Sequence, residues 1–369
     1  MLLNRRLFLK TAFGFCSYLA AGRTCEVFAS DTELHEALYY EKMPDGRVRC
    51  RHCPHACVVE KNKRGFCRIK ENKNGTFYNL AYGRPCAVHI DPIEKKPFFH
   101  VLPATISFSL ATVGCNLRCK FCQNWQISQA GPEQINSVKI SPREIVYRAK
   151  AAGCPSIAYT YTEPTIFYEY TLAIAKIARH QGIKNVMHSN GSINPEPMRN
   201  LCRYMDAINV DLKSFSEHYY RDICSGYLET VLDNLVLIKK EMGVWLELTN
   251  LVIPTLNDDA NEAQKMCAWI SDNLGEDTPI HFSRFHPMYK LAGLPPTPLS
   301  TLENFKKIAD AAGIKFAYIG NIPGHKAENT YCPNCKKALI RRTGYTILDN
   351  SITSGTCKFC QQKIPGIWT

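Results

Sequence analysis

Three cysteines near the middle of the chain carry the strongest chemical signal. Cys115, Cys119 and Cys122 follow the spacing C-x₃-C-x₂-C, with Phe121 just before the last thiol. Three thiolates can bind a [4Fe–4S] cluster and leave its fourth iron open. A ligand with an amino and a carboxylate group can chelate that iron, and S-adenosylmethionine has both groups. The alternative is a zinc knuckle with a distant fourth ligand.

A second cysteine set precedes this triad. Its spacing is C-x₂-C-x₃-C-x₉-C, and its members are Cys50, Cys53, Cys57 and Cys67. Four thiolates suit either zinc or a fully ligated iron–sulfur cluster, which could relay electrons to the central one. Both interpretations stay open at this point.

A third set lies near the end of the sequence. Two C-x₂-C pairs flank 21 residues, and their members are Cys332, Cys335, Cys357 and Cys360. Such pairs predict a zinc-ribbon-like module with a structural zinc ion, because a short tail has little core of its own. A rubredoxin-like iron is the alternative.

The composition supports metal ligation. The chain has 369 residues and 18 cysteines, of which 11 fall into the three sets, and it is far longer than a disulfide scaffold. Its formal net charge is +12. Most of this excess lies in residues 41–70, with nine basic and three acidic residues, and in 326–369, with seven and two. These basic residues offset thiolate charge, or else form a nucleic-acid surface.

Residues 1–29 have the features of a targeting signal. Arg5 and Arg6 precede Leu-Phe-Leu-Lys, a moderately apolar run follows, and Val27-Phe-Ala29 offers small residues at a cleavage position. This pattern resembles a twin-arginine signal and predicts export to the periplasm by that machinery. The alternative is a cytoplasmic protein.

The positioning elements follow from the alternation of β-rich and helical stretches between residues 105 and 325. About six strand–helix units predict an α/β fold, an incomplete (β/α)₆-type barrel of parallel strands. An N-terminal Cys-rich module with a linker (30–104) and a C-terminal zinc-ribbon-like module (326–369) complete the expected organisation. Chemistry is expected at the carboxyl ends of the strands.

Several blocks of the sequence resemble a known family. Residues 114–125 (GCNLRCKFCQNW) resemble the signature of the radical S-adenosylmethionine superfamily. The wider chain is similar to pyruvate formate-lyase activating enzymes, and among them to the AmmeMemoRadiSam system radical enzymes. The remaining blocks of the resemblance are 50–57 (CRHCPHAC), 64–67 (RGFC), 91–97 (DPIEKKP), 159–164 (YTYTEP), 210–213 (VDLK) and the terminal cysteine pairs.

The resemblance and the strand ends together single out five polar residues. Glu163 is expected to meet the ammonium group of S-adenosylmethionine, although Tyr161-Thr162 stand where relatives have glycines. Asn190 and His286 are expected to bind the same ligand. Asp211 and Lys213 are expected near the ligand or the substrate, with a catalytic role. The Lys pair of residues 91–97 could face the substrate, but it is expected in a solvated loop.

The resemblance implies an enzyme that cleaves S-adenosylmethionine reductively and abstracts hydrogen from its substrate. A glycyl residue of a protein partner is one implied target, a small molecule is another, and a reducing electron donor is required. Two alternatives remain: a radical enzyme that modifies nucleic acid, which an export signal disfavours, and a non-enzymatic multi-cluster electron carrier. An electron carrier gains nothing from an open iron.

Overall fold

The computed structural model describes residues 34–369, which form one compact unit. The predicted export signal, residues 1–29, lies outside the described residues and stays a prediction. In the described part of the chain, no helix is both long and apolar enough to cross a membrane.

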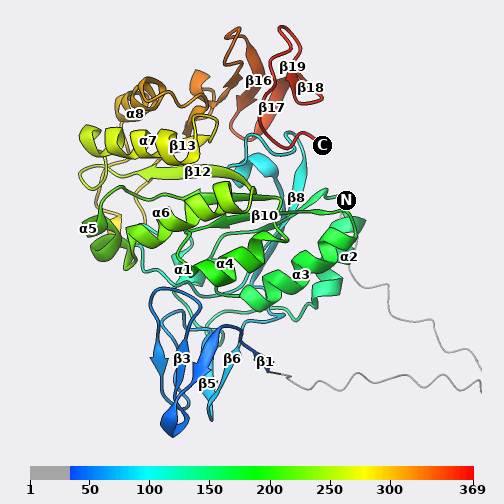
Figure 1. Ribbon diagram of the computed structural model, residues 1–369, viewed down its shortest axis with the longest axis vertical. Helices are drawn as coiled ribbons and strands as arrows, with labels where there is room; N and C mark the ends of the chain where they lie inside the picture. The colour runs from blue at the N-terminus through cyan, green and yellow to red at the C-terminus, as the bar shows by residue number, and fades with distance from the viewer. Residues whose placement is uncertain (1–33) are drawn as a thin grey trace, which may run out of the picture. The chain divides into compact units, whose positions relative to one another are not determined.

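An eight-stranded sheet organises the molecule (Figure 1). Seven strands are parallel neighbours in chain order, from β8 to β14, and β7 adds an antiparallel edge beside β8. The strands are β7 (Ala87–Pro92), β8 (Ile106–Ala111), β9 (Ser156–Tyr159), β10 (Lys184–Ser189), β11 (Ala207–Asp211), β12 (Trp245–Val252), β13 (Ile280–Arg284) and β14 (Ala317–Gly320). Because β7 and β14 do not pair, the barrel is incomplete, as predicted.

Six helices connect the parallel strands and cover one face of the sheet (Figure 1). They are α2 (Pro142–Ala151), α3 (Tyr168–His180), α4 (Pro195–Cys202), α6 (Leu228–Val236), α7 (Ala260–Leu274) and α8 (Leu299–Ala311). Ser141 is the N-cap of α2, since its Oγ accepts a hydrogen bond from the Glu144 amide at 3.2 Å. Short helices α1 (Trp125–Ser128) and α5 (Glu217–Tyr219) lie in the loops after β8 and β11.

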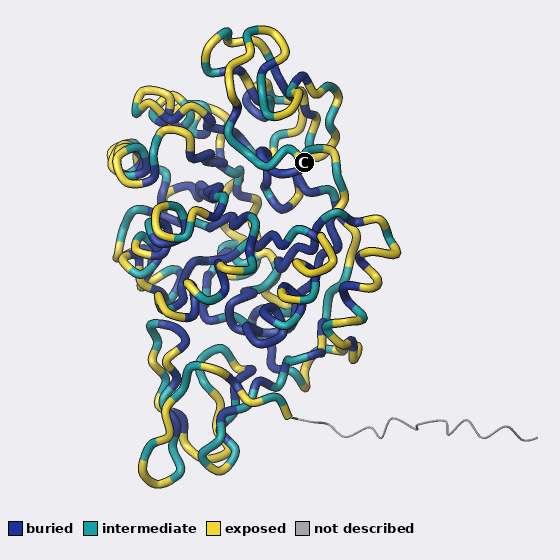
Figure 2. Tube along the Cα trace, turned by 45° about the vertical axis from the view of Figure 1, so that its right-hand side comes forward, coloured by how far each residue is buried: buried dark blue, intermediate teal, exposed yellow. Residues whose placement is uncertain are grey.

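The opposite face of the sheet is closed at one end by the segment between β7 and β8. Phe98 and Val101 pack there against small and branched residues of the central strands, including Val186. Buried Glu247 of β12 fixes this segment by accepting hydrogen bonds from the amides of residues 99 and 100. Apolar side chains thus fill one end of the half-barrel, and the carboxyl ends of the strands remain available for a site. Figure 2 shows the buried positions concentrated in this central layer.

Small antiparallel sheets form the two cysteine modules. The N-terminal module contains β1 (His35–Glu36), β2 (Tyr40–Lys42), β3 (Val48–Cys50), β4 (Val58–Val59), β5 (Lys70–Lys73) and β6 (Thr76–Asn79). The C-terminal module contains β15 (Thr330–Tyr331), β16 (Ala338–Thr343), β17 (Thr346–Asn350), β18 (Ile352–Thr353) and β19 (Thr356–Cys357). Such short strands bury little area, so each module depends on other support.

Candidate active site

One cavity of about 1010 Å³ lies at the carboxyl ends of the strands. This volume lies at the upper end of the usual range for small-molecule sites, so the cavity has room for a cofactor and part of a substrate. All eight residues predicted for the central site line it: Cys115, Cys119, Cys122, Glu163, Asn190, Asp211, Lys213 and His286. The loops after β8, β9, β10, β11 and β13 therefore converge as the barrel topology requires.

The central triad occupies the loop after β8. Its three thiols are the only cysteines among the lining residues of the cavity. The Leu117 amide donates to Cys115 Sγ at 3.3 Å, and Cys122 Sγ lies 3.1 Å from Ser128 Oγ. Hydrogen bonds to sulfur stabilise thiolate ligands and tune a cluster's potential.

A fourth cysteine lies close behind this loop. The thiol of Cys224 is a hydrogen-bond neighbour of Cys119, and it contributes together with burial to raising the pKa of Cys119. Cys224 is fully buried and does not line the cavity. The cavity therefore receives three thiols, the number that leaves one iron of a [4Fe–4S] cluster open.

Glu163 follows β9 and is almost completely buried. One carboxylate oxygen accepts from the Thr165 amide at 3.0 Å and from Ser189 Oγ at 2.8 Å, and the other accepts from the Asn190 amide at 2.7 Å. Burial raises the pKa of Glu163, while these hydrogen bonds act in the opposite direction. A bound ammonium group would supply the opposite charge that this buried carboxylate lacks.

Asn190 is held against the triad. Its side-chain amide donates to Asn116 Oδ1 at 2.9 Å and reaches Cys115 Sγ at 3.8 Å, and its Oδ1 accepts from the Ser192 amide at 2.8 Å. The side chain therefore positions the first cysteine as well as lining the cavity, a contact that the sequence did not predict.

Asp211 and Lys213 form an ion pair at the end of β11, with Nζ 2.8 Å from Oδ2. His188 of β10 lies 2.9 Å from the other oxygen of Asp211. Burial alone would raise the pKa of Asp211, but Lys213 and His188 hold it well below the usual range. Burial would lower the pKa of Lys213, and Asp211 raises it. The site thus keeps a charged pair beside Phe121, whose ring centre is 5.6 Å from Nζ.

His286 lies at the outer edge of the cavity and is exposed. His188 and Arg284 also line the cavity and were not predicted. The signal for His188 was available, since it stands one residue before the end of a strand whose alternate positions face the helices.

The expectation of a solvated Lys pair is wrong for Lys96. This residue is buried, lines the cavity and bonds both Asp91 and the hydroxyl of Tyr161. Burial lowers the pKa of Lys96 to about 8, although Asp91 acts against this. Because β7 pairs with β8 at the edge of the main sheet, the residues that directly follow it, 94–97, line the cavity instead of a solvated loop.

Tyr161 explains how the loop after β9 keeps its path without glycine. Its φ is +64°, in the left-handed region that favours glycine. The Tyr161 hydroxyl donates to Asp91, its ring lies 4.3 Å from Lys96 Nζ, and its carbonyl accepts from Asn124 at 2.7 Å. Tertiary contacts thus hold a backbone conformation that costs a non-glycine residue about 1 kcal/mol or more.

The residues fit a cluster with S-adenosylmethionine. Three thiols share a cavity large enough for both groups. Glu163 offers a buried carboxylate for the ammonium group of the ligand, and Lys213 offers a cation for a negatively charged group. This chemistry matches the donor set that an open iron and a zwitterionic ligand require.

The four C-terminal thiols converge much more closely. Their ligand atoms all lie within 4.8 Å of one another, with Sγ–Sγ distances of 3.6 Å for Cys332–Cys360 and 3.8 Å for Cys335–Cys357. A metal–sulfur bond of about 2.3 Å places tetrahedral sulfurs about 3.8 Å apart. The geometry therefore suits one tetrahedral metal ion. The N-terminal set lines a second, smaller cavity.

Comparison with known proteins agrees with this site. A match to the radical SAM superfamily spans residues 109–267, which include the triad and Glu163, Asn190, Asp211 and Lys213. An uncharacterized protein of Methanocaldococcus jannaschii is 46% identical over 333 residues, covering 90% of this chain and 99% of the relative. The chain belongs to the radical S-adenosylmethionine superfamily, and it is an enzyme of that class.

Within the superfamily the chain resembles activating enzymes. Pyruvate formate-lyase 1-activating enzyme of Escherichia coli (strain K12) is 22% identical over 224 residues, covering 56% of this chain and 89% of the relative. A solved domain of a pyruvate-formate lyase-activating enzyme from Bacteroides vulgatus has 18% identity and a TM-score of 0.40, covering 44% of this chain and 98% of that domain. Membership of an enzyme class displaces the electron-carrier alternative. The narrower AmmeMemoRadiSam assignment stays a prediction.

Proposed function

We propose that this enzyme cleaves S-adenosylmethionine reductively and abstracts a hydrogen atom from a glycyl residue of a protein partner. The observation that carries the proposal is the convergence of three thiols, a buried carboxylate and a charged pair on one cavity. When bound, the cluster and S-adenosylmethionine supply a 5′-deoxyadenosyl radical after transfer of one electron from an external donor. The chain's own residues bind, orient and shield these groups.

Glu163 would orient the ligand by accepting from its ammonium group. Its three protein hydrogen bonds fix the carboxylate plane, so little side-chain entropy is lost on binding. Asp211 and Lys213 would hold opposite charges at the next strand end, where the zwitterionic ligand and the substrate meet. The apolar segment around Phe98 excludes water from the inner end of the cavity, which protects a reactive radical.

Two observations support a protein substrate. The relatives with an assigned activity include pyruvate formate-lyase activating enzymes of Escherichia coli and Clostridium pasteurianum. The cavity also includes exposed residues at its edge, such as His286, so an extended loop of a partner can enter. For the C-terminal set we propose one structural zinc ion, since four thiolates in a tetrahedral arrangement are typical of structural zinc sites.

The test uses anaerobically reconstituted, reduced enzyme with S-adenosylmethionine and a protein extract from cells grown on α-deuterated glycine. We expect 5′-deoxyadenosine from the native enzyme and none from Cys119→Ala. Deuterium in this product, lost after protease treatment of the extract and retained after nuclease treatment, would support a glycyl target. Deuterium lost only after nuclease treatment would favour a nucleic-acid substrate and overturn the protein target.

A further inference from the structure

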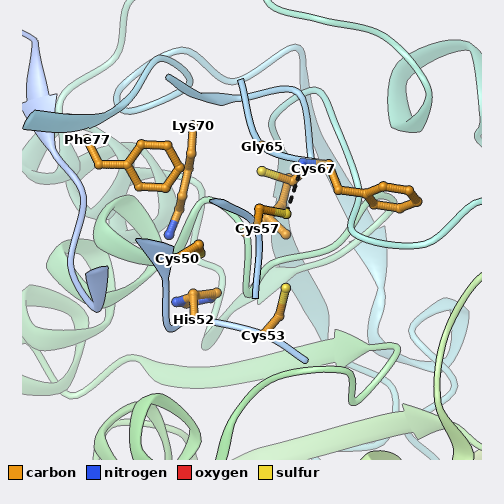
Figure 3. Close-up of a pocket in the computed structure, with 10 residues that line it drawn as sticks. Cys50, His52, Cys53, Cys57, Gly65, Cys67, Lys70 and Phe77 are labelled. Carbon is orange, nitrogen blue, oxygen red and sulfur yellow. Dashed lines mark hydrogen bonds between the residues drawn. The ribbon is translucent and has the colours of Figure 1, made fainter. Parts of the chain in front are cut away.

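The four N-terminal cysteines surround one closed space. Figure 3 shows Cys50 at the end of β3, Cys53 and Cys57 from the connection to β4, and Cys67 from the loop before β5, around a common cavity. The cavity has a volume of about 20 Å³, and Lys70 and Phe77 also line it.

The spacing of these thiols excludes the arrangement seen in the C-terminal module. Within residues 34–369, the C-terminal set is the one group of three or more Cys, His, Asp or Glu side chains gathered closely enough to hold a single metal ion, with its ligand atoms within 4.8 Å of one another. The N-terminal thiols line one cavity without forming such a group, whereas the ligands of one tetrahedral ion lie about 3.8 Å apart. A larger group is needed to touch all four.

We propose that Cys50, Cys53, Cys57 and Cys67 bind a second, fully ligated [4Fe–4S] cluster, which passes electrons one at a time toward the cluster of the central triad. Four cysteine thiolates are the usual ligands of such a cluster. The electron-transfer role rests on the proposed function, whereas the binding site does not.

The surroundings of the space suit a redox cluster. Lys70 is buried, and its ammonium group pairs with buried Glu169 at 3.4 Å. The Phe66 amide donates to Cys57 Sγ at 3.4 Å. A buried cation and an N–H donor both stabilise the more negative, reduced state of a cluster and raise its potential. Three aromatic and apolar side chains, Phe66, Phe77 and Ile166, line the same cavity and shield it from solvent.

A short chain of contacts joins this space to the central triad. The Phe66 carbonyl accepts from Arg118, whose guanidinium also donates to the Cys115 carbonyl at 2.9 Å and lies 4.0 Å from the Phe66 ring centre. A Cβ built on Gly114, whose φ is +91°, would come 2.7 Å from the carbonyl oxygen of Cys67. The backbones that carry one cysteine of each set are thus in direct contact.

Electron transfer through the N-terminal cluster is a one-electron process. A low-potential one-electron carrier, of the iron–sulfur or flavin protein class, reduces the N-terminal cluster from the 2+ to the 1+ state. The cluster returns to 2+ when the electron passes to the cluster of the triad. No bond is made or broken in this step, and no proton moves.

Acid-labile sulfide tests the binding site without S-adenosylmethionine. The variant Cys115→Ala/Cys119→Ala/Cys122→Ala, purified and reconstituted anaerobically, should retain about four iron and four sulfide per chain. Adding Cys53→Ala should remove the sulfide, and adding Cys86→Ala, outside all three sets, should not. Zinc without sulfide in the triple variant would overturn the proposal. If the triple variant does not fold, Mössbauer spectra of the native protein decide, because one cluster instead of two would also overturn it.

The potential and the rate test the relay. In the triple variant, Lys70→Met/Glu169→Gln should shift the cluster's reduction potential to a more negative value, and Lys63→Met, an exposed lysine, should not. In the otherwise native protein, Cys53→Ala should slow the appearance of the central cluster's EPR signal after photoreduction by tenfold or more. An unchanged rate would overturn the relay. Failure to form 5′-deoxyadenosine, by contrast, would count only against the proposed function.

Discussion

The central triad and the C-terminal set both consist of cysteines, but the surroundings of their thiols differ. The triad's thiols open onto a cavity of about 1010 Å³ that polar and charged side chains share. The C-terminal thiols converge within 4.8 Å and pack in an apolar cluster with Leu339, Ile340 and Ile364. One setting leaves room for a ligand, and the other leaves room for an ion alone. The space around the sulfurs, and not the number of cysteines, separates a reactive site from a structural one.

The largest expected effect is the loss of a cysteine that lines the cavity, compared with the loss of a neighbouring cysteine that does not. Cys119→Ala should lose the central cluster and all 5′-deoxyadenosine formation, because two thiols do not hold a [4Fe–4S] cluster with one open iron. Cys224→Ala removes the neighbouring thiol, which does not line the cavity. It should keep both properties. The check is 5′-deoxyadenosine measured by liquid chromatography. Loss in both variants would contradict the three-thiol assignment.

Removal of the C-terminal ion should change stability and leave chemistry at the triad intact. Cys335→Ser should lower the metal content by about one ion per chain and expose residues 326–369 to protease. The expected loss of folding free energy in the C-terminal module is large, because structural zinc contributes about 10–16 kcal/mol in isolated modules. Metal analysis and limited proteolysis measure both effects, with Cys86→Ser as the control. Loss of acid-labile sulfide in Cys335→Ser would show that this set holds a cluster instead.

A change of charge at Glu163 should affect ligand binding and not the metal sites. Glu163→Gln keeps the shape of the side chain but removes the partner of the ligand's ammonium group. A hydrogen bond to a charged group contributes about 1.5–3 kcal/mol, so the Kd for S-adenosylmethionine should rise about 10- to 100-fold. Calorimetry on the reconstituted protein measures this change. Glu144→Gln, on the exposed side of α2, should leave the Kd unchanged, and an unchanged Kd in Glu163→Gln would remove Glu163 from the binding site.

The smallest expected effect concerns the strained loop after β9. Tyr161→Phe keeps the ring over Lys96 and removes the hydroxyl that bonds Asp91. Loss of this partly buried hydrogen bond should cost about 1 kcal/mol in the free energy of unfolding. Denaturant titration measures it against Tyr147→Phe, whose ring is exposed. Equal stability of the two variants would mean that the backbone conformation needs no support from the hydroxyl.

The sequence predicted the parallel part of the fold well because local signals agree with the tertiary structure there. Ser141 and Pro142 mark the start of α2, and Gly182, whose φ is +71°, follows the end of α3. The edge strand β7 was not predicted, because residues 87–92 contain Pro92, Asp91 and His89 and lack the apolar run of a buried strand. Pairing with β8, a long-range interaction, fixes it.

The site was predictable where chemistry depends on spacing and unpredictable where it depends on packing. The triad follows from C-x₃-C-x₂-C, and Glu163, Asp211 and Lys213 follow from strand ends together with the resemblance to activating enzymes. Lys96 was misplaced because nothing local signals burial of a lysine in a charged stretch. The left-handed φ of Tyr161 also has no local signal, since it is held by residues up to 70 positions away. The arrangement of the four N-terminal thiols around one cavity likewise depends on tertiary structure and not on their spacing in the sequence.

The C-terminal module also forms part of the wall of the large cavity, through Glu328, Gly344 and Tyr345. None of these residues belongs to the cysteine sets, and the tyrosine lies in the turn between β16 and β17. This part of the cavity wall therefore comes from a different stretch of chain than the cysteines of the central triad. A substitution in this turn would alter the cavity wall and leave every cysteine of the three sets in place.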